Sequence, residues 1–271
     1  MTIEQLAAAR VFHGLHHEGL LVLANAWDAA TARLFESLGA RAIATTSAAV
    51  AWSHGYADGD LLPVPLLRAT VADIARVIRV PLSVDVETGY SDEPAAVGDV
   101  VGGVIEAGAV GINLEDGTRA PDLLCAKIER AKAAARRLGA ELFVNARADV
   151  YLRALVPEAR RLDETLERAE RYRAAGADGF FVPGLTDPTV IRRIAAAVPL
   201  PLNVLAGPGL PGAAELLALG VRRLSAGSGI ARAALGRTAA LTAAFLRDGS
   251  SDRLASEAVS YADLNALMAA R

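Results

Sequence analysis

The chain has 271 residues, of which 53% are hydrophobic and 22% charged, so it can bury a large core and shows no compositional sign of disorder. A formal net charge of −3 and a pI near 5.9 argue against a nucleic-acid-binding protein, which needs a basic face for the phosphate backbone. The single cysteine excludes an internal disulfide, and neither a signal peptide nor a membrane-spanning stretch is evident, so we expect a cytoplasmic protein without nucleic-acid or membrane partners.

Short apolar segments alternate with longer helical segments along the whole chain. Eight segments are predicted to be strands: Leu20–Asn25, Ala42–Thr46, Leu82–Val86, Val110–Leu114, Leu142–Ala146, Gly179–Val182, Leu202–Leu205 and Arg222–Ser225. The helical segments between them are Ala29–Leu38, Leu66–Val77, Ala95–Ala107, Leu123–Leu138, Leu162–Ala175, Pro188–Ala197 and Ala213–Leu219. Glycines such as Gly39 and Gly176 follow these helices and supply the left-handed C-cap that a helix needs before the chain turns into a sheet.

This alternation favours an α/β fold with a parallel (β/α)8 barrel of the TIM type over the alternative, a doubly wound open sheet. No linker rich in Pro, Gly or Ser divides the chain, so residues 1–271 are expected to form one barrel domain. After the eighth strand, Ser228–Leu246 is predicted to be a helix, and a last helix runs to Arg271. This tail of about 228–271 exceeds what barrel closure needs, and it packs either on a neighbouring subunit or on its own barrel.

Three of the predicted strands end in charged residues. Asp85 and Glu87 end the third strand, Glu115 and Asp116 the fourth, and Arg147 the fifth. In a barrel the carboxyl ends of neighbouring strands face one another, and catalytic groups gather there. Mg²⁺ prefers carboxylate and water oxygens, so Asp85, Glu87 and Glu115 are predicted to share a magnesium ion.

Acidic side chains at such positions can instead cap the helices that follow the strands. We expect that role for Asp92, Glu93, Asp116 and Asp149. Capping does not explain why acids converge from two neighbouring strands, so the prediction of a metal site stands for the other three.

Arg147 is the candidate anion-binding residue. Its planar fork suits bidentate binding of a carboxylate or phosphonate, although it can instead neutralise Glu115 or Asp149. Asn203 interrupts the apolar seventh strand, and it either hydrogen-bonds a substrate carboxylate or forms a turn. Trp27, just beyond the first strand, either walls the pocket or packs against the core.

The second strand runs into a loop of small residues that includes Thr46, Ser47 and Ala48, whose backbone N–H groups can cradle an anionic oxygen. The segment 52–60, rich in glycine and acids, then suits either a mobile active-site loop or an ordinary surface loop.

Other nucleophiles and metal ligands are not indicated. The histidines lack metal-ligand spacing, and His13, His16 and His17 on the first helix are expected to be solvated. Cys125 is expected to lie in a helix with a structural role.

Together these segments resemble the isocitrate lyase/phosphoenolpyruvate mutase superfamily over nearly the whole chain. The resemblance is carried by residues 25–33, 46–50, 85–90, 113–117, 145–149 and 220–225. The Asp-x-Glu-x-Gly-Tyr element at 85–90, combined with the later Glu-Asp pair at 115–116, is specific to this superfamily.

The resemblance implies a barrel whose eighth helix is swapped between subunits of a homodimer or homotetramer. It implies Mg²⁺, or Mn²⁺ in its place, bound by Asp85, with Glu87 and Glu115 contacting the ion directly or through water. The partner molecule would be a small 2-oxo or 2-hydroxy carboxylate that chelates this ion.

Further site residues follow from the same resemblance. Arg147 and the backbone of Ser47 and Ala48 would hold the substrate carboxylate, and Asp58 would lie on a mobile loop. Asp58 and Arg147 are the expected catalytic residues, while the general acid or base stays unassigned.

The chain also departs from the best-known members. The Lys-Lys/Arg-Cys-Gly-His loop of isocitrate and methylisocitrate lyases is missing from residues 117–125, and so is the lysine-bearing loop of phosphonate-cleaving members. We therefore expect a divergent Mg²⁺-dependent lyase that cleaves or forms a C–C bond, by decarboxylation or retro-aldol/Claisen chemistry through a metal-bound enolate, in a small 2-oxo or 2-hydroxy di- or tricarboxylate. The alternatives are a P–C bond enzyme of the phosphoenolpyruvate mutase/phosphonopyruvate hydrolase type and a catalytically silent 2-oxo-acid-binding protein.

Overall fold

Parallel strands form the centre of the molecule. The computed structural model describes residues 2–256 and 258–269, and within these ranges nine strands share one sheet. The strands are β1 (Leu21–Leu23), β2 (Asn25–Ala26), β3 (Ile43–Thr45), β4 (Leu82–Asp85), β5 (Gly111–Glu115), β6 (Phe143–Arg147), β7 (Gly179–Val182), β8 (Leu202–Leu205) and β9 (Val221–Ser225).

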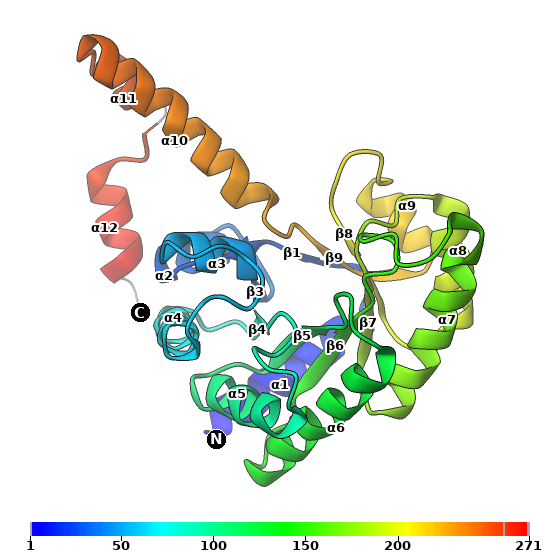
Figure 1. The fold of residues 1–271 in the computed structure, drawn as a ribbon. Helices are drawn as coiled ribbons and strands as arrows, with labels where there is room; N and C mark the ends of the chain where they lie inside the picture. Colours follow the sequence, from blue (N-terminus) through cyan, green and yellow to red (C-terminus); the bar gives the residue numbers. More distant parts are fainter. Residues whose placement is uncertain (1, 257, 270–271) are drawn as a thin grey trace.

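The sheet closes into a barrel (Figure 1). Its order is β1-β9-β8-β7-β6-β5-β4-β3-β2, and every neighbouring pair is parallel. β1 and β2 are two pieces of one extended segment separated only by Ala24, so the two ends of the sheet come together in the chain itself. The (β/α)8 barrel predicted from the sequence is therefore confirmed, and an open doubly wound sheet is excluded.

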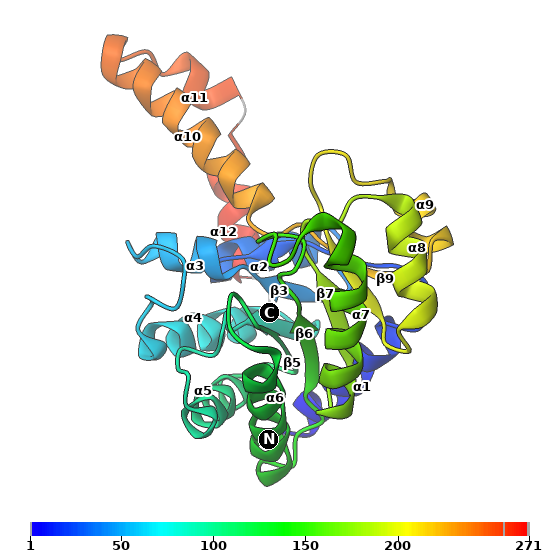
Figure 2. The same cartoon turned by 45° about the vertical axis from the view of Figure 1, so that its right-hand side comes forward.

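Helices follow the strands and surround the barrel (Figures 1 and 2). Those in the described ranges are α1 (Ile3–Leu15), α2 (Ala29–Ser37), α3 (Ser47–Ser53), α4 (Val64–Val77), α5 (Pro94–Glu106), α6 (Pro121–Arg137), α7 (Glu158–Ala174), α8 (Pro188–Ala197), α9 (Ala213–Ala218), α10 (Gly229–Asp248), α11 (Asp252–Ser256) and α12 (Tyr261–Ala269). None of these described helices combines the length and the apolar character needed to cross a lipid bilayer.

Local sequence sets where several helices begin. Pro94, Pro121 and Pro188 start α5, α6 and α8, where a missing N–H costs nothing and the fixed φ suits the first turn. Asp28 caps α2 by accepting a hydrogen bond from the backbone N–H of Thr31 at 2.7 Å, and the Thr31 side chain completes a capping box. These signals follow the strand ends, so they also fix where the loops around the barrel mouth end.

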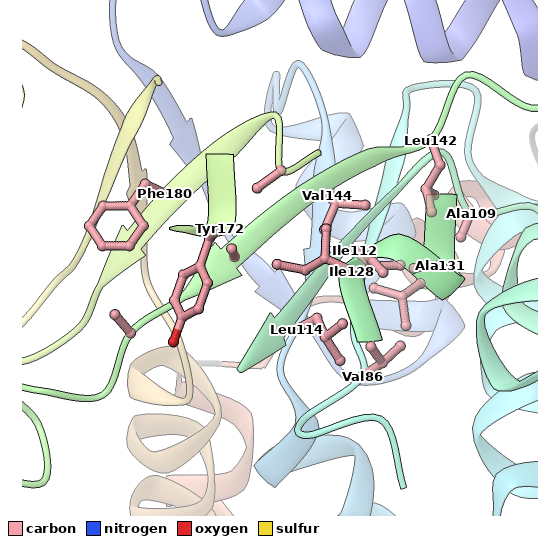
Figure 3. Close-up of a cluster of buried hydrophobic side chains, with 14 of the residues drawn as sticks. Val86, Ala109, Ile112, Leu114, Ile128, Ala131, Leu142, Val144, Tyr172 and Phe180 are labelled. Atoms are coloured by element: carbon pink, nitrogen blue, oxygen red, sulfur yellow. The ribbon is translucent and has the colours of Figure 1, made fainter. Parts of the chain in front are cut away.

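The layer between the strands and the helices is apolar (Figure 3). The fully buried side chains of this layer include Ile112 and Leu114 of β5, Val144 of β6, and Ile128 and Ala131 of α6. Each large aliphatic side chain buried in this way contributes about 1.5–3 kcal/mol. Because side chains alternate along a strand, the residues between these point into the barrel, and that alternation directs the strand-end acids inward.

The amino-terminal end of the barrel interior is closed by α1. Phe12 of α1 is fully buried, and its ring meets that of Phe143 edge-on at 5.4 Å between centroids. A Cβ at Gly111 would lie 2.6 Å from Phe12 Cε1, so only glycine leaves room for the ring at this point of β5.

His16 belongs to this closed end, and the expectation that it is solvated is wrong. Its ring stacks on Phe143 at 4.0 Å, and its Nδ1 lies 2.8 Å from the carbonyl oxygen of Phe12. Burial lowers the pKa of His16 to about 3. The sequence pattern does not reveal the burial of His16, because α1 covers the amino-terminal end of the barrel instead of lying on its outer face. His17, the next residue, is exposed as expected.

The predicted elements agree closely with those observed. β7 and β8 have the predicted bounds, and the other strand segments shift by one residue at either end. Two segments differ in kind. The predicted small-residue loop turns directly into α3 at Ser47, because alanine-rich sequence favours a helix. The predicted last helix is two short helices, α11 and α12.

The C-terminal tail leaves the barrel. α10 projects outward, and α12 returns beside α2 (Figures 1 and 2). There the guanidinium of Arg33 donates to the carbonyl oxygen of Leu267 at 3.2 Å.

Candidate active site

A cavity of about 120 Å³ lies at the carboxyl ends of the strands, where a barrel enzyme holds its site. Six of the residues predicted for the site line it, namely Thr46, Ser47, Ala48, Asp58, Asp85 and Arg147. Two larger cavities, of about 490 and 620 Å³, lie beside α1 at the opposite end of the barrel, away from this group.

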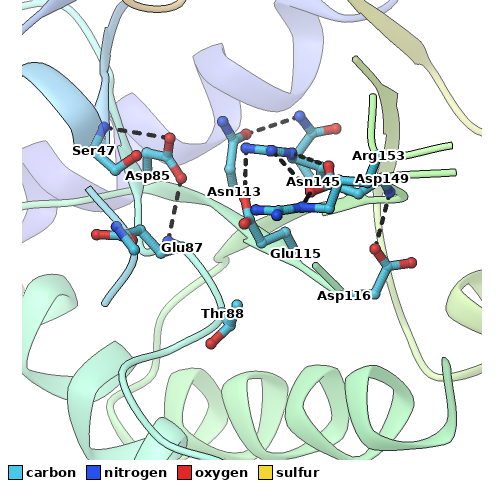
Figure 4. A network of polar contacts seen from close by, with 12 residues as sticks. Ser47, Asp85, Glu87, Thr88, Asn113, Glu115, Asp116, Asn145, Asp149 and Arg153 are labelled. Carbon is cyan, nitrogen blue, oxygen red and sulfur yellow. Dashed lines mark hydrogen bonds and ion pairs between the residues drawn. The ribbon is translucent and has the colours of Figure 1, made fainter. Parts of the chain in front are cut away.

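Asp85 ends β4 and faces the cavity (Figure 4). Its carboxylate accepts hydrogen bonds from the backbone N–H of Ser47 at 3.4 Å and of Glu87 at 3.3 Å. Its own N–H donates to Thr45 Oγ1 at 2.8 Å, which fixes the strand end. Burial raises the pKa of Asp85, and the nearby Arg147 guanidinium opposes that rise.

Arg147 ends β6 and is held by two carboxylates. Its Nη1 lies 2.5 Å from Glu115 Oε2, while its Nε and Nη2 donate to Asp149 at 2.6 and 3.1 Å. Its guanidinium carbon lies 5.8 Å from the centre of the Phe181 ring. These bonds use three of the five N–H donors of a guanidinium, so two donors stay available on the cavity side.

Asp116 and Asp149 support the site from behind, and the expectation that they cap helices is wrong. Asp149 is fully buried and also binds Arg153, at 2.7 Å. Asp116 accepts hydrogen bonds from Arg168 at 2.7 Å, from the Tyr172 hydroxyl at 2.6 Å and from the backbone N–H of Asp149 at 2.9 Å. The pair fails to cap because α6 and α7 begin several residues further on, at Pro121 and Glu158.

A reciprocal set of hydrogen bonds joins the Asp58 loop to the loop after β4. Glu87 Oε2 accepts from the backbone N–H groups of Gly59, at 2.8 Å, and of Asp60. The carboxylate of Asp60 in turn accepts from the Thr88 hydroxyl at 2.5 Å and from the Thr88 and Tyr90 N–H groups, both at 3.2 Å. Asp60, Glu87 and Tyr90 all have positive φ, so these bonds hold a strained backbone that positions Asp58 beside the cavity.

Glu87 and Glu115 lie beside the cavity without lining it. Besides its bonds to the Asp58 loop, Glu87 accepts from the Tyr90 hydroxyl at 3.1 Å, whereas Glu115 is paired with Arg147. Across the described ranges, no group of three His, Cys, Asp or Glu side chains converges in a way that could hold a metal ion. The three acids predicted to share an ion therefore do not converge on one point, and only Asp85 among them lines the cavity.

The donor chemistry nevertheless fits a magnesium ion. The carboxylates of Asp58 and Asp85 line one cavity. Burial raises the pKa of Glu87 to about 7, and the charges of Asp58 and Asp85 add to that rise. A divalent cation offsets such an excess of negative charge, and Mg²⁺ needs only one or two carboxylates alongside water and substrate oxygens. The roles of Asp85 as a direct ligand, and of Glu87 and Glu115 as residues that contact the ion directly or through water, stay predictions.

Two predicted residues lie outside the cavity lining. Trp27 is half-buried and packs edge-on against Phe35, with the ring centres 6.4 Å apart. Asn203 is fully buried, and its amide nitrogen donates to the carbonyl oxygens of Val204 and Arg223 at 2.8 and 3.2 Å. Their roles in substrate binding stay predictions, and this placement gives them no support.

The structure also brings residues to the cavity that sequence reasoning missed. Asn25, Asn113, Phe181 and Ser225 line it. Asn25, Asn113 and Asn203 all interrupt apolar strands, so the sequence carries the same signal at each of them. Only Asn203 was predicted from that signal, and it does not line the cavity.

Cys125 lies within α6, as expected. Burial raises the pKa of its thiol, which keeps it protonated and a poor nucleophile.

The sequence and the fold are matched by known proteins. Residues 12–246 match the family model of phosphoenolpyruvate phosphomutase. An uncharacterized protein of Mycobacterium tuberculosis is 40% identical over 222 residues, which cover 80% of this chain and 81% of that protein. The 2-methylisocitrate lyase of Escherichia coli is 30% identical over 203 residues, which cover 69% of this chain and 66% of that enzyme. The oxaloacetate decarboxylase of Bradyrhizobium sp. is 31% identical over 193 residues, or 68% of this chain and 65% of that enzyme.

Solved structures of similar proteins superpose on nearly the whole chain. A protein of Burkholderia cenocepacia J2315, provisionally described as a lyase/mutase, superposes with a TM-score of 0.90 at 37% identity, over 99% of this chain and 98% of that one. Phosphonopyruvate hydrolase in complex with oxalate and Mg²⁺ gives a TM-score of 0.83 at 25% identity, over 96% of this chain and 94% of that one.

Proposed function

Because the chain belongs to the phosphoenolpyruvate phosphomutase family, we propose that it is a Mg²⁺-dependent lyase that cleaves or forms a C–C bond in a small 2-oxo or 2-hydroxy di- or tricarboxylate. The observation that carries the proposal is the cavity that presents Asp58, Asp85 and Arg147 together at the barrel mouth. Two relatives with C–C chemistry in their names, 2-methylisocitrate lyase and oxaloacetate decarboxylase, support this substrate class.

In this proposal the basic residue binds the substrate carboxylate and the acidic residue binds the metal ion. Arg147 binds a substrate carboxylate through the donors that Glu115 and Asp149 leave available. Ser47 and Ala48 line the same cavity, and their backbone orients the same anion. Asp85 is the direct ligand of Mg²⁺, which when bound stabilises negative charge that develops on substrate oxygens.

Asp58 is the proton-transfer candidate. It lies on an exposed loop and lines the cavity, so its carboxylate can exchange protons with both the ligand and water. The hydrogen bonds of Glu87 and Asp60 hold the backbone next to Asp58 and so set the position of Asp58 relative to Asp85. The carboxyl oxygens of Asp58 are then the atoms that we propose to transfer a proton to or from the ligand.

P–C bond chemistry is the second candidate. It is favoured by the matching family model and by the similarity to phosphonopyruvate hydrolase. The guanidinium of Arg147 suits a phosphonate as well as a carboxylate, so the cavity alone does not separate the two reactions. A panel of oxaloacetate, methylisocitrate and phosphonopyruvate, assayed side by side with Mg²⁺, separates them.

The same panel tests the proposal through one substitution. Wild type is expected to turn over at least one carboxylate of the panel in Mg²⁺ and to stop in EDTA. Asp85→Ala is expected to have no Mg²⁺-dependent turnover, while the control Asp99→Ala, which removes an exposed carboxylate on α5, keeps wild-type rates. Turnover by Asp85→Ala at the wild-type rate would falsify the mechanism, and oxalate binding without any turnover would favour a catalytically silent binding protein.

The swapped helix is part of the proposal. α10 extends from the barrel with Leu235 and Leu246 exposed at 55% and 78%. A neighbouring subunit would cover these apolar side chains, giving a homodimer or a homotetramer. Light scattering on the purified protein tests this, since a monomer at micromolar concentration contradicts it. The cytoplasmic location also stays a prediction.

A further inference from the structure

A layer of polar side chains separates the apolar end of the barrel interior from the cavity. Asn113, Asn145, Asn203 and Arg223 are all buried and come from four different strands. In the strand register, Asp85 pairs with Asn113, and Asn113 pairs with Asn145 (Figure 4). This layer therefore begins directly beside the predicted magnesium ligand.

Arg223 is the unusual member of the layer. It is fully buried, and within the described residues no carboxylate lies within ion-pair distance of it. Its guanidinium carbon lies 5.9 Å from the centre of the Phe12 ring, and its Nη1 has no hydrogen-bond partner. Burial lowers the pKa of Arg223 to about 9, so it stays charged at neutral pH. A buried charge without an ion-pair partner lowers stability, and attraction to the Asp85 carboxylate offsets that cost only in part.

The hydrogen bonds of Arg223 fix the orientation of the Asn113 amide. Arginine can only donate, so the atom of Asn113 that lies 3.1 Å from Arg223 Nη2 is the acceptor, Oδ1. The amide nitrogen of Asn145 donates to the same Oδ1 at 2.9 Å and to Asn203 Oδ1 at 3.0 Å. Both lone pairs of Asn113 Oδ1 are thus used inside the barrel, which leaves the NH₂ group on its other side.

The NH₂ group of Asn113 faces the cavity. Asn113 lines that cavity, and its nitrogen has no acceptor in the part of the chain that the structure describes. This nitrogen is not among the buried polar atoms that are sealed from solvent without a partner. Donation from a cationic guanidinium to Oδ1 polarises the amide and strengthens its N–H groups as donors.

We propose that Asn113 is a substrate-binding residue whose NH₂ group donates to an anionic oxygen of the substrate, and that Arg223 is the positioning residue that holds and polarises its amide. The inference rests on the proposed function, because it takes the ligand of the cavity to be a carboxylate. It explains why a costly positive charge lies beneath a cavity that already contains Arg147. A bound anion adds to the attraction that the Asp85 carboxylate already exerts on the guanidinium of Arg223.

The test is calorimetric titration of oxalate into the full-length protein with saturating Mg²⁺. Asn113→Ser replaces the NH₂ donor by a hydroxyl on a side chain one atom shorter, which lies further from the substrate, and it is expected to weaken oxalate binding about tenfold or more. Asn113→Asp keeps both internal hydrogen bonds and pairs with Arg223, so it should unfold at the wild-type temperature or above it and bind oxalate at least as weakly as Asn113→Ser.

Arg223 is tested by two substitutions and a matched control. Arg223→Met removes a charge without an ion-pair partner, so its melting temperature should not fall, yet oxalate binding is expected to weaken several-fold. Arg223→Lys, which can still donate to Asn113, should recover part of that loss. Arg222→Met removes the neighbouring arginine of β9, which is not directed into the interior, and should bind oxalate like wild type.

The outcomes separate this inference from the proposed function. If wild type does not bind oxalate in Mg²⁺, the proposed function is wrong and the inference goes with it. If wild type binds and the folded Asn113 variants bind equally well, the proposed function stands and the inference is overturned. Equal binding by Arg223→Met and wild type would leave Asn113 as a ligand but reject the role of Arg223.

Discussion

The two ends of the barrel interior are built from opposite kinds of side chain. At the amino end, Phe12, Phe143 and Leu23 are buried in a small apolar cluster beneath α1. At the carboxyl end, Asp85 and Arg147 face a cavity. The first end follows the rule that apolar surface leaves water, whereas the second breaks it by holding charged groups away from bulk water, at a cost in solvation free energy. The difference indicates that one end supplies stability and the other uses part of it for binding and chemistry.

The largest effect is expected from a substitution that affects only the carboxyl end. Asp85→Asn removes a buried carboxylate whose pKa burial raises, so the free energy of unfolding should stay the same or rise. Loss of a magnesium ligand removes several kcal/mol of transition-state stabilisation, which corresponds to a fall of about three orders of magnitude in kcat/KM. Urea unfolding and steady-state kinetics on one sample check both halves. A large loss of stability would show that the two ends are not separable.

The opposite result is expected at the amino end. Phe143→Ala leaves a cavity beneath α1 and should lower the free energy of unfolding by about 3–5 kcal/mol. Kinetics at a temperature where the variant is folded should give a KM close to wild type, because Phe143 does not line the active-site cavity. The control Leu38→Ala, at a side chain that is 76% exposed after α2, should change stability by much less. An altered KM in folded Phe143→Ala would contradict the view that the amino end of the barrel supplies stability and not substrate binding.

Acid should weaken the amino end through His16. The folded-state pKa of His16 is about 3, below its ordinary value of 6.5, so the unfolded chain binds the proton first. Its contribution to stability is complete above pH 6.5 and is lost as the pH falls from 6.5 towards 3. Between pH 6.5 and 5 the loss is about 2 kcal/mol. Urea unfolding of His16→Gln should lack this component, whereas exposed His17→Gln should keep it, and identical pH profiles for all three proteins would contradict the assignment.

The smallest effect is expected from the loops that join the Asp58 segment to the β4 end. Thr88→Val removes the hydroxyl that donates to Asp60 at 2.5 Å and leaves both backbone donors in place. We expect a loss of about 1 kcal/mol in stability and a fall of up to about tenfold in kcat/KM. Thr118→Val, at an exposed position, is the matched control. An unchanged rate for Thr88→Val would mean that these hydrogen bonds do not position Asp58.

Most of the fold could be predicted from the sequence because its signals are local. Apolar runs of strand length, glycine C-caps and the acids at strand ends are each read within a few neighbouring residues, and they placed Asp85, Glu115 and Arg147 at the barrel mouth. The same signals failed wherever partners lie far apart in the chain. Asp60 and Thr88 are 28 residues apart, and no local pattern links them.

The polar interior layer shows the same limit more sharply. Arg223 lies on a strand in the sequence Val-Arg-Arg-Leu-Ser, which gives no sign that one arginine is fully buried and its neighbour is not. Asn113 and Asn203 look alike as polar interruptions of apolar strands, yet only Asn113 lines the cavity. What distinguishes them is the height of each residue along the tilted strands, which the barrel sets as a whole.

Anomalous diffraction from crystals soaked with Mn²⁺ and oxalate would locate the ion in the cavity. We expect one strong peak there, within coordination distance of the Asp85 carboxylate, with oxalate contacting both the ion and Arg147. A cavity without such a peak at saturating Mn²⁺, or a peak that leaves Asp85 without contact, would contradict the proposed metal site.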